Sequence, residues 1–136
     1  MNLEEIDESL PNGFHDAMLV GLEIDYVHRI AVFKTKVLVG MPDEPVEIRD
    51  RYRLGTLRFS GVSFLVVDPP AATSAFLQPG ATSFSWSRLD AAEFPQIAEL
   101  ALSEPDVQAY SFYVQDWYSC IHIAATEISF VWSELE

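Results

Sequence analysis

The chain has 136 residues, of which 49% are hydrophobic and 12% aromatic, and its formal net charge is −13. This composition excludes a disordered chain and predicts one compact domain over residues 1–136 with a hydrophobic core. A single cysteine, Cys120, excludes an intramolecular disulfide bond. No apolar run approaches the roughly 20 residues of a membrane helix, and no basic and apolar leader opens the sequence, so we expect a cytoplasmic protein.

The charges are segregated along the sequence. All eight basic residues lie between Arg29 and Arg88, whereas residues 1–28 hold seven acidic residues and residues 89–136 hold nine. Such a negative field repels nucleic acid and anionic membranes, so we expect a basic protein as partner and neither nucleic-acid nor membrane binding. The alternative is that the acidic residues serve solubility alone, because net charge governs association and not fold.

The first segment predicts a short helix followed by a hairpin. Asn2 is a helix-capping residue with Glu5 at the capping-box position, so residues 2–9 are expected to be helical. Residues 10–13 read Leu-Pro-Asn-Gly, which is typical of a tight turn. Apolar and acidic residues alternate over 22–26, and 30–39 is rich in β-branched and aromatic residues. Together these patterns predict an antiparallel hairpin over 17–39.

The middle of the chain contains one ambiguous segment and one long strand. Residues 46–53 fit either a helix, in which Glu47 and Arg51 pair, or a strand, in which arginines at every second position share one face. Residues 54–67 predict a long strand or a bent pair of strands, with Gly55 and Gly61 as points of bulging or close packing. Residues 71–80 carry no strong pattern and are expected to form a loop.

The last third predicts one helix and a second hairpin. Residues 82–86 are a strand candidate, and 95–103 is the main helix, because Pro95 suits a first helical turn and Pro105 ends the pattern. Residues 108–132 predict a hairpin that turns near 116–119, with a bulge near 124–126 where the apolar positions change phase. The sum is an α+β domain, mainly an antiparallel β-sheet of about six strands with two hairpins, one main helix and a short N-terminal helix.

Chemical motifs are weak. No phosphate-binding loop, paired Cys-x-x-Cys or known nucleophile motif occurs, so we predict no catalytic residue, no cofactor and no metal site. Cys120 and His122 come closest, because residues two apart on a strand share a face and could serve as nucleophile and base or as two zinc ligands. Further ligands would have to come from His15, Asp16 and His28. The simpler interpretation is a buried cysteine and a hydrogen-bonded edge histidine.

His15 and Asp16 form a second weak motif. An acid beside a histidine can orient it as a general base. Adjacent residues on a strand point to opposite faces, however, so we expect the two side chains not to meet. We expect instead that Asp16 or Asn12 accepts hydrogen bonds from backbone amides at the exit of the turn.

Two further groups have both a structural and a functional interpretation. Arg49, Arg51, Arg53 and Arg58 form a basic group able to bind phosphate or carboxylate, but in an acidic chain we expect its own carboxylates to neutralise it. The C-terminal hairpin is rich in aromatic residues on both predicted faces, which either core packing or a binding surface explains. These are Tyr110, Phe112, Tyr113, Trp117, Tyr118, Phe130 and Trp132.

Two stretches resemble known families. Residues 10–17, Leu-Pro-Asn-Gly-Phe-His-Asp-Ala, resemble the opening of a family of small uncharacterised bacterial proteins, and the stretch from Phe112 to Trp132 is similar to the closing hairpin of that family. More loosely, the length, the acidity and the segment from Leu57 to Val62 are similar to immunity proteins of bacterial polymorphic toxin systems. Neither resemblance supplies a functional residue.

We therefore expect a binding protein without catalytic activity, immunity-like, that uses its acidic surface and C-terminal aromatic residues to bind a partner. The expected binding residues are His15, Asp16, Trp117, Tyr118 and His122. The alternative is a small-molecule-binding, metal-binding or enzymatic domain, with a site around His15, Cys120 and His122 at the mouth of the sheet.

Overall fold

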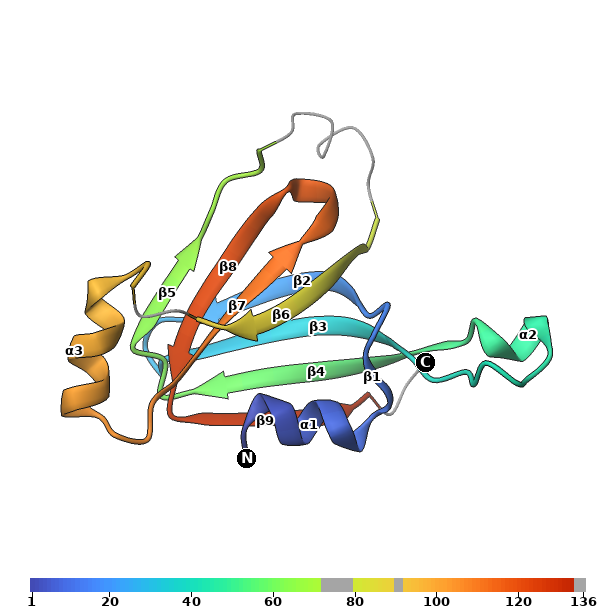
Figure 1. Ribbon diagram of the computed structural model, residues 1–136, viewed down its shortest axis with the longest axis horizontal. Helices are drawn as coiled ribbons and strands as arrows, with labels where there is room; N and C mark the ends of the chain where they lie inside the picture. The colour runs from blue at the N-terminus through green and yellow to red at the C-terminus, as the bar shows by residue number, and fades with distance from the viewer. Residues whose placement is uncertain (72–79, 90–91, 134–136) are drawn as a thin grey trace.

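The computed structural model describes residues 1–71, 80–89 and 92–133, and these form a mainly antiparallel β-sheet with a few short helices (Figure 1). The described helices are α1 (Leu3–Ser9), α2 (Val46–Arg49), α3 (Pro95–Ser103) and the 3₁₀ turn η2 (Gln115–Trp117). The strands are β1 (Pro11–Phe14), β2 (Met18–Asp25), β3 (Ile30–Leu38), β4 (Tyr52–Ser60), β5 (Phe64–Val67), β6 (Thr82–Arg88), β7 (Gln108–Val114), β8 (Ser119–Ala125) and β9 (Glu127–Trp132). None of the described helices combines the length and the apolar character of a membrane-spanning helix.

The sheet has eight strands in the order β5-β8-β7-β6-β2-β3-β4-β9, so the prediction of about six strands is wrong. The difference arises because two long stretches of strand, one over residues 52–67 and one over residues 119–132, are each divided into two strands at the same corner of the sheet. Gly61, with a φ of 65°, separates β4 from β5, and Thr126 separates β8 from β9. The backbone N–H of Thr126 donates to the Ser60 carbonyl at 3.1 Å, and that of Ser63 donates to the Ala124 carbonyl at 3.0 Å. Pairing therefore continues around the corner.

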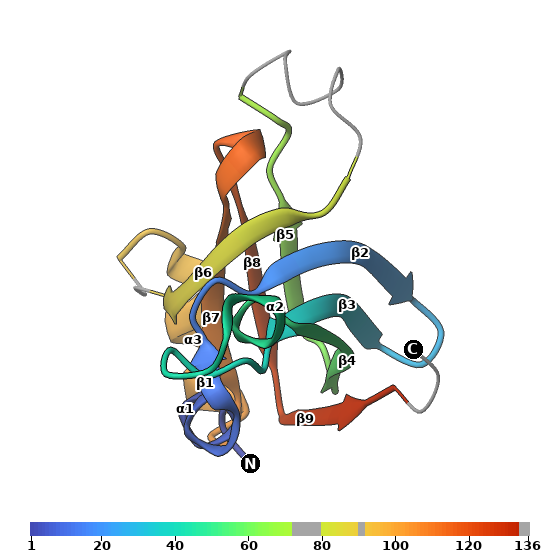
Figure 2. The ribbon, with the colours of Figure 1, turned by 90° about the vertical axis from the view of Figure 1, so that its right-hand side faces the viewer.

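This corner rolls the sheet back onto itself. β4 pairs with β9 and its continuation β5 pairs with β8, while β7, β6, β2 and β3 complete the circuit back to β4. The two views show one set of strands crossing the other at a steep angle, which is typical of sheets that turn corners through bends (Figures 1 and 2). The strand pairing around the rolled sheet is shortest between β2 and β6, where the register pairs are Met18 with Ser83 and Leu19 with Thr82. The rolled sheet consequently has an open mouth beside β2.

Alternating side chains fill the interior of the rolled sheet. On β3 the inward residues Ala31, Phe33, Thr35 and Val37 are buried, whereas Lys34 and Lys36 between them are exposed. The Phe33 ring lies 4.8 Å from the Phe112 ring, centroid to centroid, so the core joins strands from both directions. Helix α1 closes one end of the core with Leu3 and Ile6. A smaller cluster joins α3 to the outer face of β5 and β8, so that face is covered only in part.

Most local predictions are confirmed. The helix 95–103 and the hairpin 17–39 appear as α3 and as β2–β3, and Asn2 and Glu5 form the expected capping box on α1. The two interpretations of residues 46–53 both hold in part, because α2 ends at Arg49 and β4 begins at Tyr52. The predicted turn at residues 10–13 contains the start of strand β1, although Gly13 N–H still donates to the Leu10 carbonyl at 3.2 Å.

Strand predictions in the second half are also largely confirmed. Residues 54–67 form a bent pair of strands, and Gly55 is a close-packing point, since a side chain there would overlap the Phe130 ring. The C-terminal hairpin turns through η2 and changes phase at Thr126, as the apolar pattern predicts. The strand predicted over 82–86 extends to Arg88. The loop predicted at 71–80 lies largely outside the described residues.

Candidate functional site

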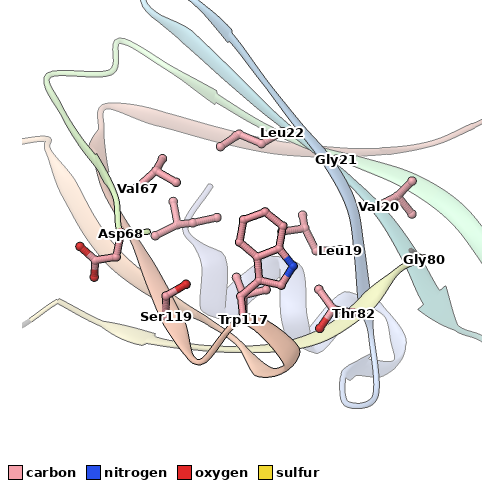
Figure 3. A pocket seen from close by; sticks show the side chains of 12 residues that line it. Leu19, Val20, Gly21, Leu22, Val67, Asp68, Gly80, Thr82, Trp117 and Ser119 are labelled. Atoms are coloured by element: carbon pink, nitrogen blue, oxygen red, sulfur yellow. The ribbon is translucent and has the colours of Figure 1, made fainter. Parts of the chain in front are cut away.

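A cavity of about 320 Å³ opens at the mouth of the rolled sheet, between β2 and the strands β5, β7 and β8 (Figure 3). Its lining is mainly aliphatic, with one tryptophan side chain across it. The lining residues are Leu19, Val20, Gly21, Leu22, Val67, Asp68, Gly80, Thr82, Val114, Trp117, Ser119 and Ile121. Because β2 and β6 separate after two residue pairs, the cavity lies where the sheet fails to close.

Few polar groups of this lining are free to contact a ligand. The Thr82 hydroxyl accepts the backbone N–H of Asp116 at 3.0 Å. The Asp68 carboxylate turns away from the cavity, whereas the Ser119 hydroxyl points toward it (Figure 3). The cavity therefore offers an apolar wall with one evident polar contact, which suits an apolar ligand.

The tip of the β7–β8 hairpin stands beside this cavity. Trp117 is 38% exposed and lines it, while its neighbour Tyr118 is 60% exposed, has a φ of 50° and does not line it. The other aromatic residues of the hairpin divide by face. Tyr110 and Phe112 are fully buried in the core, and Phe130 and Trp132 pack against it. Core packing therefore explains these four, and Tyr113, Trp117 and Tyr118 are left at the surface.

A second polar cluster lies on the outer face of the same strands. Ser111 on β7 and His122 on β8 are register partners, and the Ser111 hydroxyl lies 2.7 Å from His122 Nδ1. On the other side of the ring, His122 Nε2 lies 3.5 Å from an Asp68 carboxylate oxygen. The His122 side chain is 8% exposed, and the Phe94 ring covers it at 4.8 Å between centroids. His122 is hydrogen-bonded, as predicted, but the prediction that it lies at a sheet edge is wrong, because β8 is paired with β5 on one side and with β7 on the other.

Cys120 lies on the same outer face as His122, but its surroundings disfavour the thiolate form. Burial raises the pKa of the Cys120 thiol, and the negative charges of Asp68 and Glu93 raise this pKa further. A raised pKa keeps the thiol protonated at neutral pH, where only the thiolate is a good nucleophile. The ring nitrogens of His122 face Ser111 and Asp68 instead.

The side chains of His15 and Asp16 do meet, contrary to the prediction. They lie in a turn after β1, where Asp16 has a φ of 58°, so strand alternation does not apply to them. His15 Nε2 lies 3.3 Å from the Asp16 carboxylate, with side chains 79% and 62% exposed. Among the described residues no backbone amide donates to the Asn12 side chain, whose amide group instead donates to the carbonyls of Leu38 and Gly40 at 3.0 and 2.9 Å. The pair is a solvent-exposed contact.

The remaining predicted ligand, His28, sits in the β2–β3 turn, where its Nδ1 lies 2.8 Å from Asp25. This hydrogen bond lowers the pKa of the Asp25 carboxyl. Across residues 1–71, 80–89 and 92–133, no three His, Cys, Asp or Glu side chains are arranged to hold a metal ion. The structure therefore does not gather His15, His28, Cys120 and His122 into one centre among these residues.

The basic residues have several environments. Arg88 pairs with Glu4, Lys34 with Glu23 at 2.9 Å and Arg29 with Glu104 at 4.0 Å, so flanking acids neutralise part of the basic middle segment. Arg53 stacks over the Trp132 ring, 4.8 Å from its centroid. By contrast, no described carboxylate forms an ion pair with Arg49, Arg51 or Arg58, so the predicted neutralisation is not seen for these three arginines among the described residues.

Sequence reasoning missed both the cavity and two members of the outer cluster. In the sequence, the cavity residues Leu19, Leu22 and Ile121 have the pattern of ordinary core positions. They line a cavity because β2 and β6 pair over only a short stretch, which no local pattern predicts. Ser111 and Asp68 carry no motif. Register alone brings Ser111 opposite His122, and the pairing of β5 with β8 brings Asp68 to the other side of the ring.

Comparison with known proteins adds no relative. No family model, no curated protein and no solved structure matches the chain. The resemblances to a small bacterial family and to immunity proteins therefore stay predictions, and the functional argument rests on the geometry of the cavity and of the outer cluster.

Proposed function

We propose that this chain is a binding protein whose cavity at the mouth of the rolled sheet takes a small, uncharged, apolar molecule. The observation that carries the proposal is the apolar lining of a cavity of about 320 Å³. That volume falls at the lower end of ligand pockets, roughly 300–1,000 Å³, which are typically apolar with a few polar groups that fix orientation. Trp117 supplies a large flat contact surface, and the Ser119 hydroxyl supplies one hydrogen-bonding group.

Charge narrows the class of ligand. The net charge of −13 disfavours an anion at the mouth. The Asp68 carboxylate faces away from the cavity and toward His122, so it offers no counter-ion inside. A neutral ligand has the smallest desolvation cost on entering such a cavity, because burying a charge without a partner costs free energy.

The test compares two fluorescent probes of similar size, neutral N-phenylnaphthylamine and anionic anilinonaphthalene sulfonate. We expect the wild-type chain to bind the neutral probe more tightly. Ser119→Leu fills the cavity and Trp117→Ala removes its aromatic wall, so each should weaken binding about tenfold, which corresponds to about 1.4 kcal/mol. Tyr118→Ala is the matched control, since Tyr118 is exposed beside the cavity but does not line it. Unsaturable binding, or equal affinity in Ser119→Leu, would contradict the proposal.

A second candidate function is binding of a basic protein at the hairpin tip. The exposed sequence Asp116-Trp117-Tyr118 combines a negative charge with two aromatic side chains, which are frequent anchors of protein interfaces. Retention of a basic protein from source lysate should weaken steeply with ionic strength and should weaken in Tyr118→Ala. Because Ser119→Leu blocks only the cavity and Tyr118→Ala alters only the tip, the two variants separate the candidates.

A further inference from the structure

The outer face of β5, β7 and β8 holds three polar side chains in series, of which Asp68 also borders the cavity while its carboxylate faces His122. The Ser111 hydroxyl, the two ring nitrogens of His122 and the Asp68 carboxylate follow one another at 2.7 and 3.5 Å. Each residue comes from a different strand or its end, and the Asp68 backbone N–H donates to the Cys120 carbonyl at 3.0 Å. The series is therefore held by the sheet itself, which is a more rigid support than a loop.

The order of the atoms fixes how the ring serves as a base. With its proton on Nε2, His122 directs an N–H toward the Asp68 carboxylate and leaves the Nδ1 lone pair to accept the Ser111 O–H. A carboxylate in this place favours that tautomer and stabilises the imidazolium that forms when the ring takes a second proton. This is the division of roles found in serine nucleophile systems, with the two ring nitrogens exchanged.

The side chains of His122 and Ser111 differ in how far they are buried. The His122 side chain is 8% exposed and lies under the Phe94 ring, so the imidazole ring is shielded from water. Ser111 is only half-buried. A nucleophilic serine requires a base within hydrogen-bond reach of its hydroxyl, and His122 provides one.

We propose that Ser111 is a nucleophile, that His122 is its general base and that Asp68 positions His122, and that the site takes the acyl group of a neutral or cationic ester. The Ser111 oxygen bonds to the ester carbonyl carbon while its proton moves to His122 Nδ1. The bond to the leaving alcohol breaks, and the alcohol takes that proton. A water molecule then gives a proton to Nδ1 and attacks the acyl carbon, and Ser111 leaves with the proton, so the products are an alcohol and a carboxylic acid.

Charge around the site defines the substrate class. Asp68 and Glu93 are near enough to Cys120, two residues from His122 on the same face, to act on it electrostatically. Such a negative surrounding disfavours an anionic ester and leaves neutral or cationic ones.

The experiment uses a neutral fluorophosphonate probe, which phosphonylates activated serines, with intact mass and peptide mapping as readout. We expect one adduct at Ser111, none in Ser111→Ala, and labelling slower by about a hundredfold in His122→Gln, the lower range for loss of a general base. Ser87→Ala is the matched control, because Ser87 is the register partner of Ser111 on β6 and should label at the wild-type rate. Asp68 is half-exposed, so Asp68→Asn provides a second variant that retains the fold and should also slow labelling.

Circular dichroism of each variant establishes that it is folded before its rate is compared. Hydrolysis of nitrophenyl acetate, followed by release of nitrophenolate, should show the same order of variants. Failure of folded wild-type protein to form the Ser111 adduct would overturn the proposal. Equal labelling rates in wild type and in folded Asp68→Asn and His122→Gln would overturn it as well, because the serine would then react without the help of its neighbours.

Discussion

The two faces of the β7–β8 hairpin are built from the same strands and yet provide different environments. Inward residues such as Phe112, Val114 and Ile121 are buried in the core or line the cavity. The residues between them, Ser111, Tyr113 and His122, face the other way and carry hydroxyl and imidazole groups. Because successive side chains of a strand point to opposite faces, neighbouring residues of this hairpin have different roles. Residues on one face form the core and the apolar cavity wall, and residues on the other face provide polar side chains.

Truncation of one aromatic residue on each face should produce the largest contrast. Phe112 is 1% exposed and packs against the rings of Phe33, Phe59 and Phe84. Phe112→Ala should lower the free energy of unfolding by about 3–5 kcal/mol. Tyr113→Ala, at the next position and 40% exposed, should change it by about 0.5 kcal/mol or less. Urea unfolding measures both, and similar losses would show that the outer face is covered in solution.

Removal of one buried hydroxyl should have an intermediate effect. The Tyr110 hydroxyl accepts the Leu3 backbone N–H at 3.3 Å and donates to the Gln108 side chain at 3.1 Å. Tyr110→Phe leaves the Leu3 N–H without a partner, so it should cost about 1–3 kcal/mol. Tyr113→Phe serves as control and should be nearly neutral in the same unfolding experiment. A neutral Tyr110→Phe would mean that α1 does not dock on β7 through this bond.

The same residue predicts a dependence of stability on pH. Burial raises the pKa of Tyr110 above its ordinary value, so the folded state holds this proton more tightly than the unfolded state. The free energy of unfolding should therefore fall as the pH rises past the ordinary tyrosine pKa of about 10. Unfolding curves collected in alkaline buffers should show a smaller decline in Tyr110→Phe. An equal decline in both chains would assign the effect to other groups.

The smallest expected effect is on thiol reactivity at the outer face. Because burial and then Asp68 and Glu93 raise the pKa of Cys120, its alkylation by iodoacetamide near neutral pH should be slower than that of a free thiol. Asp68→Asn should speed alkylation by removing one negative charge. Asp106→Asn is the control, since Asp106 does not act on this thiol. A rate that is indifferent to Asp68 would leave burial as the sole cause.

Local sequence patterns predicted most helices and strands, but they did not predict which distant strands pair with one another. The capping box of Asn2 and Glu5 and the Pro95 start of α3 depend on residues within one helical turn, so sequence alone locates them. The pairing of Gly55 with Trp132 depends on contacts far apart in the chain, and no local pattern encodes it. For the same reason, His122 could be singled out as a candidate, whereas its partners Ser111 and Asp68 could not.

The corner at Gly61 and Thr126 also affects when the strands can pair during synthesis of the chain. β4 leaves the ribosome well before its partner β9, so the β2–β4 meander waits with one unpaired edge until residues 127–132 emerge. Closing such non-local pairs is slow, commonly milliseconds to seconds. An open edge attracts other strands during that interval. Outward Lys36 and Arg58, on and beside that unpaired edge, place like charges on every nascent copy and so discourage association between chains.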